Sequence, residues 1–209
     1  FEPSTRTRFS FGCAFNLLGG HVRETTGVKE SSISKGESLY DTARVISGYS
    51  DVIVMRHPQI GSVAEFAKAS RVPVINGGDG PNEHPSQALL DLYTIRRTFR
   101  FADEKRTPRP QFEVLSDAYP NLTADVSNKT FAFCGDLGRG RTVRSLVELL
   151  MKFDNVSMVF ISPDHPKFQL SDDLIGRLRD QGVPFEEVNS LDARLDGIPV
   201  LHQVDCLYM

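Results

Sequence analysis

The stretch KTFAFCGDLGRGRTVRSL (129–146) decides the fold class, because it joins a short apolar run to a glycine-rich turn and the start of a helix. The run KTFAFC predicts a strand, and the apolar spacing after the turn predicts a helix over 142–153. The same pattern continues downstream with an expected helix near 171–180 and expected strands at 157–162, 183–188 and 204–209. Strands that alternate with helices form parallel sheets, so this half of the chain predicts an α/β architecture.

The preceding half repeats this alternation. DVIVM (51–55) and VPVIN (72–76) are compact apolar runs, as expected for strands that are buried on both faces. A longer helix, SQALLDLYTIRRTF (86–99), follows, and its apolar stripe is expected to comprise Leu89, Leu92, Tyr93 and Ile95. The chain therefore predicts two subdomains, each with a mostly parallel sheet flanked by helices.

A polar, proline-containing segment separates the two halves. Residues 99–128 interrupt the alternation of strands and helices, which indicates an insertion or linker. The simplest interpretation of this segment is a surface excursion without a function of its own. The expected organisation is a first subdomain over 1–98 that ends in an interdomain helix, and a second over 129–209.

Composition excludes several classes of protein. The 209 residues have a formal net charge of −3, so nothing indicates a nucleic-acid partner or an acidic membrane surface. No apolar run approaches the ~18 residues of a membrane span. Cys13, Cys134 and Cys206 lack metal-ligand spacing and are typical of reduced core residues in a cytoplasmic protein. The chain starts on Phe inside a motif, which indicates a piece of a longer polypeptide.

The first residues, FEPSTRTRFSF (1–11), combine helix-capping side chains with an arginine. Ser4, Thr5 and Thr7 surround Arg6 at the head of a helical pattern that ends at Gly19-Gly20. Free backbone N–H groups, hydroxyls and a guanidinium at one helix end form an anion site, and phosphate is its natural ligand. The alternative is a capped surface helix with a solvated arginine.

Four other positions carry residues that a plain α/β fold does not require. Lys35 lies in a polar loop, where it could reach a phosphate or be merely solvated. Arg56 directly follows a buried strand, and Arg141 lies in the second strand-to-helix turn, both at sheet edges where α/β sites form. His84 lies at a helix start, which favours neutral imidazole, with Gln87 one turn later.

These residues suit the attack of a nucleophile on a small carbonyl compound that carries a phosphate. Thr7, Arg56 and His84 would polarise the carbonyl oxygen, and the departing phosphate would take the proton, since no acidic general base is evident. Arg141 would hold a carboxylated nucleophile. The turn GDLGRG has the glycine order G-x-x-G-x-G, so the sequence gives little support to a nicotinamide site.

Five stretches in order, FEPSTRTRFSF, KGESLYDT, MRHPQ, GDGPNEHPSQALLDLYTI and GDLGRGRTVRSL, resemble the catalytic chain of the aspartate carbamoyltransferases. The resemblance implies a two-domain α/β homotrimer with active sites shared between subunits. It assigns the phosphate of carbamoyl phosphate to Ser4, Thr5, Arg6 and Thr7. A neighbouring subunit would lend Ser31 and Lys35. Further substrate contacts fall to Arg56, His84 and Gln87, and the contact with aspartate falls to Arg141.

The same resemblance implies the reaction: transfer of the carbamoyl group from carbamoyl phosphate to the amine of L-aspartate, in pyrimidine biosynthesis. It makes 1–98 the carbamoyl-phosphate-binding domain and 129–209 the aspartate-binding domain. No cofactor or metal is expected, whereas a regulatory chain or a fused domain is possible. Two alternatives stay open: an ornithine carbamoyltransferase, and a catalytically silent homologue that serves as a binding or scaffold subunit. The family's later aspartate-binding loop is expected beyond Met209.

Overall fold

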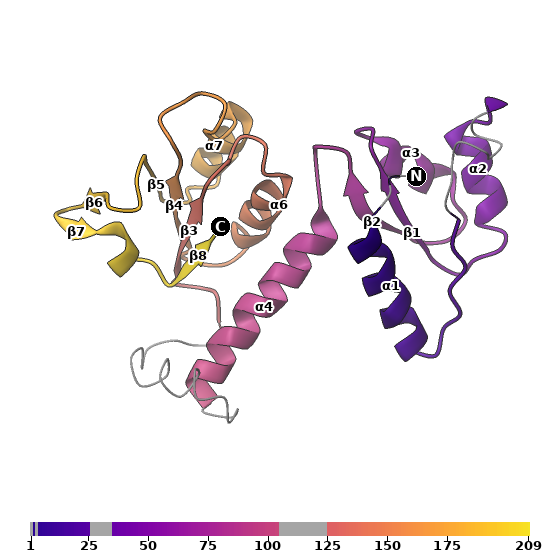
Figure 1. Ribbon diagram of the computed structural model, residues 1–209, viewed down its shortest axis with the longest axis horizontal. Coiled ribbons are helices and arrows are strands. Elements are labelled where there is room, and N and C mark those ends of the chain that lie inside the picture. Colours follow the sequence, from indigo (N-terminus) through magenta and orange to yellow (C-terminus); the bar gives the residue numbers. More distant parts are fainter. Residues whose placement is uncertain (1, 3, 26–34, 105–124) are drawn as a thin grey trace. The chain divides into compact units, whose positions relative to one another are not determined.

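The computed structural model describes residue 2 and residues 4–25, 35–104 and 125–209. Within it the chain forms two compact units, Phe1–Ser86 and Gln87–Met209. The first unit contains α1 (Thr5–Leu17), α2 (Leu39–Ile46), β1 (Ile53–His57), α3 (Ser62–Ala69) and β2 (Val74–Asp79) (Figure 1). The element α4 (Pro85–Glu104) begins at the boundary, and its helix lies mainly in the second unit.

The first unit is built on one parallel strand pair. β1 and β2 pair in parallel from Ile53 opposite Val74 onward, and the register shifts between Met55 and His57. A small core fills the space between the strands and the helices α2 and α3, and its buried members are Ala43, Met55, Val63, Phe66 and Ala69. The helix-like segment before the first strand and both expected strands are thus confirmed.

The second unit holds a larger sheet. Its remaining elements are β3 (Thr130–Cys134), α6 (Arg141–Leu150), β4 (Ser157–Ile161), α7 (Asp172–Asp180), β5 (Phe185–Val188), β6 (Arg194–Leu195), β7 (Ile198–Pro199), η3 (Val200–His202) and β8 (Cys206–Tyr208). The sheet order is β5-β4-β3-β8, and every neighbouring pair is parallel. The predicted α/β class with helix-flanked parallel sheets is confirmed.

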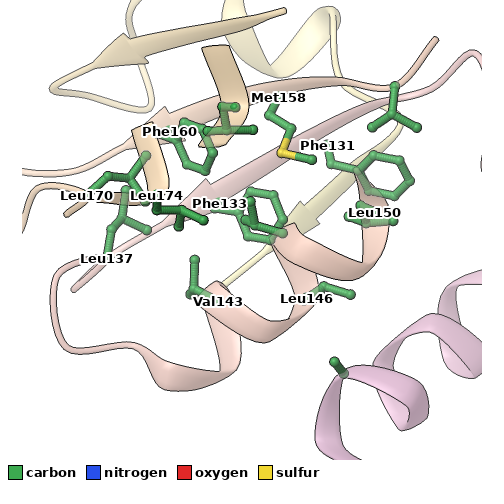
Figure 2. Close-up of a cluster of buried hydrophobic side chains, with 14 of the residues drawn as sticks. Phe131, Phe133, Leu137, Val143, Leu146, Leu150, Met158, Phe160, Leu170 and Leu174 are labelled. Atoms are coloured by element: carbon green, nitrogen blue, oxygen red, sulfur yellow. The ribbon is translucent and has the colours of Figure 1, made fainter. Parts of the chain in front are cut away.

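Aromatic and branched side chains from the sheet and α6 form the core of this unit. Figure 2 shows Phe133 and Phe160 in adjacent strands, and their rings stack with centroids 5.5 Å apart. On α6, the buried residues Val143, Leu146, Val147 and Leu150 follow the spacing of a single helix face. The sheet and this face therefore bury each other, which explains why a short apolar run followed by a helical pattern folds in this way.

The prediction for the apolar stripe of α4 was partly wrong. Ile95 is buried and Leu92 packs against the core, but Leu89 and Tyr93 are 59% and 64% exposed. The buried face instead comprises Ala88, Leu92, Ile95 and Phe99, a set spaced at four, three and four residues. Ala88 is small and only modestly hydrophobic, so the sequence pattern did not mark it as part of the buried face.

The helix α4 is also longer than its pattern indicated, since it runs to Glu104. The first residues of the expected linker, 99–128, are therefore helical, and residues 105–124 lie outside the described part. The compact units divide at Ser86, at the beginning of α4. The functional division into 1–98 and 129–209 stays a prediction.

Two further details differ from expectation. Cys13 is exposed on α1, so the expectation of a core position is wrong for this cysteine, whereas Cys134 and Cys206 are partly buried. An unexpected antiparallel hairpin joins β6 to β7 through Asp196 and Gly197, both at positive φ. Asp-Gly is a frequent two-residue hairpin turn, so the sequence did contain this signal.

None of the helices in the described ranges is long and apolar enough to cross a membrane.

Candidate active site

The start of α1 is organised by Ser4 and Thr7. The Ser4 hydroxyl accepts a hydrogen bond from the Thr7 backbone N–H at 3.3 Å, and it donates to Thr7 Oγ1 at 2.9 Å. Ser4 is thus the N-cap that the sequence predicted. Thr5 and Arg6 are exposed. Because the first N–H groups of a helix lack partners within the helix, this end presents donors and a guanidinium to an incoming anion.

Arg56 brings distant segments of the first unit together. It lies next to the end of β1, at the register shift opposite β2. Its Nη1 donates to Thr7 Oγ1 at 3.4 Å and lies 3.4 Å from His84 Nε2. Thr7 and His84 therefore both meet the same guanidinium nitrogen of Arg56. These are the three residues that were predicted to polarise a carbonyl oxygen.

Glu2 is the residue of this site that the sequence reasoning missed. Its carboxylate accepts a hydrogen bond from Arg56 Nη2, and its backbone N–H donates to the Arg56 carbonyl at 3.1 Å. Both side chains are largely buried, with 15% of Arg56 and 24% of Glu2 exposed. The carboxylate fixes one edge of the guanidinium, so that the other edge faces Thr7 and His84. The available signal was an acidic residue two positions before the helix cap.

Glycines in β2 allow this close approach. A Cβ atom on Gly78 would lie 3.3 Å from Arg56 Cγ, and the Gly78 φ of +136° disfavours any side chain. A Cβ atom on Gly77 would lie 3.4 Å from Thr7 Cγ2. Gly77 and Gly78 thus let the Thr7 side chain and the aliphatic part of Arg56 pack closely against β2.

His84 is 9% exposed and contacts polar groups on both sides of its ring. Because Arg56 can only donate, its contact with Nε2 is a hydrogen bond only when that nitrogen carries no proton. On the other side, Nδ1 lies 3.4 Å from the Ser86 hydroxyl. A hydroxyl can donate or accept, so Ser86 is compatible with either neutral tautomer, including the one in which Nε2–H donates to a ligand oxygen.

His57 and Asp79 are the last residues of β1 and β2. Burial is the main cause that lowers the pKa of His57. The Asp79 carboxylate is buried and accepts a hydrogen bond from the Gly61 backbone N–H at 2.9 Å. This contact ties the start of α3 to the end of β2, and we interpret it as structural.

The remaining predicted residues lie elsewhere in the chain. Lys35 is exposed in the first unit, and Ser31 lies outside the described residues. Gln87 and Arg141 belong to the second unit, where Gln87 donates to Asp91 and Arg141 is the first residue of α6. No group of three His, Cys, Asp or Glu side chains suited to a metal ion occurs within the described ranges.

The cluster at Arg56 combines a helix N-terminus, a hydroxyl, a guanidinium and an imidazole. Such donors suit a phosphate that is attached to a polarisable carbonyl group. Consistent with this chemistry, residues 1–97 match the sequence model of the aspartate/ornithine carbamoyltransferase carbamoyl-P binding domain.

Relatives extend the match over the whole chain. The aspartate carbamoyltransferase catalytic subunit of Saccharophagus degradans is 54% identical over 208 residues, which are 100% of this chain and 53% of that protein. The solved catalytic subunit of M. jannaschii aspartate transcarbamoylase has a TM-score of 0.74 and 46% identity over 94% of this chain and 56% of its own. The Trypanosoma cruzi enzyme, solved with carbamoyl phosphate and aspartate, has a TM-score of 0.75 and 34% identity over 100% of this chain and 60% of its own.

The chain spans about half the length of the curated relatives it matches. Across that span the likeness is continuous and includes both compact units. By its sequence motifs, its fold and these relatives, the chain belongs to the family of aspartate carbamoyltransferase catalytic subunits.

Proposed function

We propose that the full-length protein transfers the carbamoyl group of carbamoyl phosphate to the amine of L-aspartate. The amine nitrogen forms a bond to the carbonyl carbon, the bond between that carbon and the phosphate oxygen breaks, and N-carbamoyl-L-aspartate and phosphate leave. The observation that carries this proposal is the position of Arg56 Nη1, 3.4 Å from both Thr7 Oγ1 and His84 Nε2.

Phosphate binding falls to the start of α1. The hydroxyls and backbone N–H groups of Ser4, Thr5 and Thr7 and the guanidinium of Arg6 supply donors to its oxygens. Ser31 and Lys35 of a neighbouring subunit complete this part of the site, which requires an oligomer, and the family resemblance makes that oligomer a homotrimer. The exposed position of Lys35 is compatible with such a role.

Carbonyl activation falls to Thr7, Arg56 and His84. As the amine attacks, negative charge grows on the carbonyl oxygen, and donors that are already in place stabilise it without reorganisation. Gln87 contacts the carbamoyl amide. The departing phosphate accepts the proton from the attacking nitrogen, so the reaction needs no separate basic side chain.

Arg141 provides a cation for a carboxylate of aspartate, at the first residue of α6. In this scheme 1–98 form the carbamoyl-phosphate domain, 129–209 form the aspartate domain, and 99–128 link them. The relatives named for aspartate, at up to 57% identity, favour aspartate over ornithine as the acceptor. The chain retains every residue that we propose to bind the phosphate or to polarise the carbonyl, which weighs against a silent scaffold subunit. We place the enzyme in the cytoplasm, without a cofactor, and a regulatory chain or a fused domain remains compatible with this proposal.

The test is phosphate release by the full-length protein from carbamoyl phosphate, with aspartate and ornithine supplied in separate reactions. We expect release with aspartate only. Release with ornithine only would replace the acceptor, and no release with either would favour the scaffold alternative.

A second experiment addresses the shared site. Lys35→Ala and Arg6→Ala chains are each expected to form inactive homotrimers. Mixed trimers should regain activity, because some sites would then receive both intact residues. Properly reassembled hybrids without activity would refute the exchange of Lys35 between subunits.

A further inference from the structure

A carboxylate on α4 connects Gln87 to the sheet of the second unit. Asp91 Oδ1 accepts a hydrogen bond from Gln87 Nε2 at 2.9 Å. Its other oxygen, Oδ2, accepts from the Tyr208 hydroxyl at 3.1 Å. Through these two hydrogen bonds, Asp91 links Gln87, one helical turn earlier on α4, to Tyr208 in β8.

The partner of Asp91 on the sheet is itself held in place. The Tyr208 ring lies 5.8 Å from the ring of Phe133, which is fully buried. Thr142, in the first turn of α6 next to Arg141, is close enough to the Tyr208 hydroxyl to influence its pKa. Burial raises the pKa of Tyr208, so the phenol stays protonated and acts as a donor at neutral pH. The Asp91 carboxylate therefore has a fixed position.

A fixed carboxylate determines the orientation of the neighbouring amide. The two ends of a glutamine amide have nearly the same shape, but one end donates and the other accepts. An ionised carboxylate only accepts, so the amide must turn its NH2 group toward Asp91. Gln87 Oε1 is consequently left as an acceptor for a different donor.

We propose that Asp91 is a positioning residue, which commits the Gln87 NH2 group so that Gln87 Oε1 accepts a hydrogen bond from the carbamoyl NH2 of the substrate. This role rests on the proposed function. It distinguishes carbamoyl phosphate from phosphorylated compounds of similar shape that carry no NH2 group, since those would leave the Gln87 oxygen without a donor.

The first test is Asp91→Asn in the full-length protein. Tyr208 would still donate to the single oxygen of the new side-chain amide, so the NH2 group of that amide would face Gln87 and favour the reversed orientation of the Gln87 amide. We expect the KM for carbamoyl phosphate to rise about five-fold, the size of one lost hydrogen bond. The kcat should change less, because this contact is made equally in the ground state and the transition state. Asp173→Asn is the matched control, since Asp173 also contacts a side chain four residues along its helix but lies on the exposed surface of α7.

The second test is rescue by Tyr208→Phe. In the Asp91→Asn, Tyr208→Phe double variant, the new amide at position 91 loses the tyrosine donor and is released to turn its oxygen toward Gln87. The KM should then fall below that of Asp91→Asn alone, whereas a merely structural role for Asp91 predicts additional damage. In a Gln87→Ala background, Asp91→Asn should no longer change the KM.

These experiments separate the two proposals. An active wild type with an unchanged KM in Asp91→Asn would overturn the role of Asp91 and leave the proposed reaction intact. An unreduced effect in the Gln87→Ala background, or a higher KM in the double variant, would overturn it as well. A wild type that releases no phosphate would overturn the proposed function, and the role of Asp91 in that reaction with it.

Discussion

The two compact units differ in how they are held together. The second unit buries aromatic and aliphatic side chains from β3 and β4 and from α4, α6 and α7. The first unit buries a much smaller set around β1, and of the large side chains that are fully buried in the described residues, only Phe66 belongs to it. Its α1 has no buried side chain at all, and Leu17 on this helix is 88% exposed.

The candidate catalytic residues depend on polar contacts and not on a large hydrophobic core. Thr7, Arg56 and His84 occupy the unit with the smaller core, and polar contacts to Glu2 and Ser86 hold them. A single guanidinium with several partners organises that site, whereas the second unit depends on close packing of its interior. Substitutions should therefore affect stability most in the second unit and activity most in the first.

The largest effect on stability is expected for Phe133→Ala. Phe133 is fully buried against Phe160 and Tyr208, so truncation removes apolar contacts and leaves a cavity. The free energy of unfolding should fall by about 3–5 kcal/mol, measured by urea denaturation of the 209-residue chain. Phe9→Ala is the control, because Phe9 on α1 is 67% exposed, and its change should stay within about 0.5 kcal/mol. Equal losses for both variants would remove the contrast between the units.

The largest effect on activity is expected for Arg56→Ala in the full-length protein. Turnover should fall by about 10²–10³-fold, because the variant loses the charged donor that we propose for the reacting carbonyl. Arg71→Ala, at an exposed arginine in the first unit, should leave turnover unchanged. Steady-state phosphate release measures both variants. Near-normal turnover of Arg56→Ala would exclude Arg56 from the mechanism.

Gly78→Ala tests the close approach between β2 and Arg56. The new methyl group would meet the Arg56 stem at 3.3 Å in a backbone conformation that disfavours side chains. We expect a loss of about 1–3 kcal/mol in unfolding free energy together with reduced turnover. The control is Gly182→Ala, where φ is +66° and the space around the Cβ is open, so the conformational penalty is smaller and turnover should stay unchanged. If Gly78→Ala kept full turnover, the close approach of Gly78 would not be needed to position the Arg56 side chain.

The smallest expected effect is a pH dependence that arises from His57. Its pKa in the folded chain lies below the 6.5 of the unfolded chain, so the unfolded state binds more protons at mildly acidic pH. The stability contribution is present above pH 6.5 and is lost as the pH falls below that value toward the lower folded pKa. His57→Asn should flatten this loss, as measured by urea denaturation across the pH range.

The control for this experiment is His165→Asn. Both histidines accept a backbone N–H two residues ahead at Nδ1, but His165 is exposed. A flattening of similar size in His165→Asn would show that burial of His57 is not the cause.

Local patterns predicted much of this fold. The apolar runs at 51–55 and 157–162 predicted β1 (Ile53–His57) and β4 (Ser157–Ile161), because each run is short, apolar and followed by a turn and a helical pattern. Ser4 was predictable as a helix cap, since the capping interaction is made within four residues of chain. The buried face of α4 was predicted only in part, because which of its apolar residues meet the core depends on the sheet beneath.

Three features can be read directly from the sequence: the alternation of strands and helices, the capped start of α1 and the chemical types of the candidate site residues. These features depend on spacing and side-chain chemistry within short stretches. In contrast, the pairing of Glu2 with Arg56 and the position of Asp91 between Gln87 and Tyr208 become visible only in the folded chain. The physical reason is sequence separation: the first pair is 54 positions apart and Asp91 is 117 positions from Tyr208, so strand pairing and core packing alone bring these groups together.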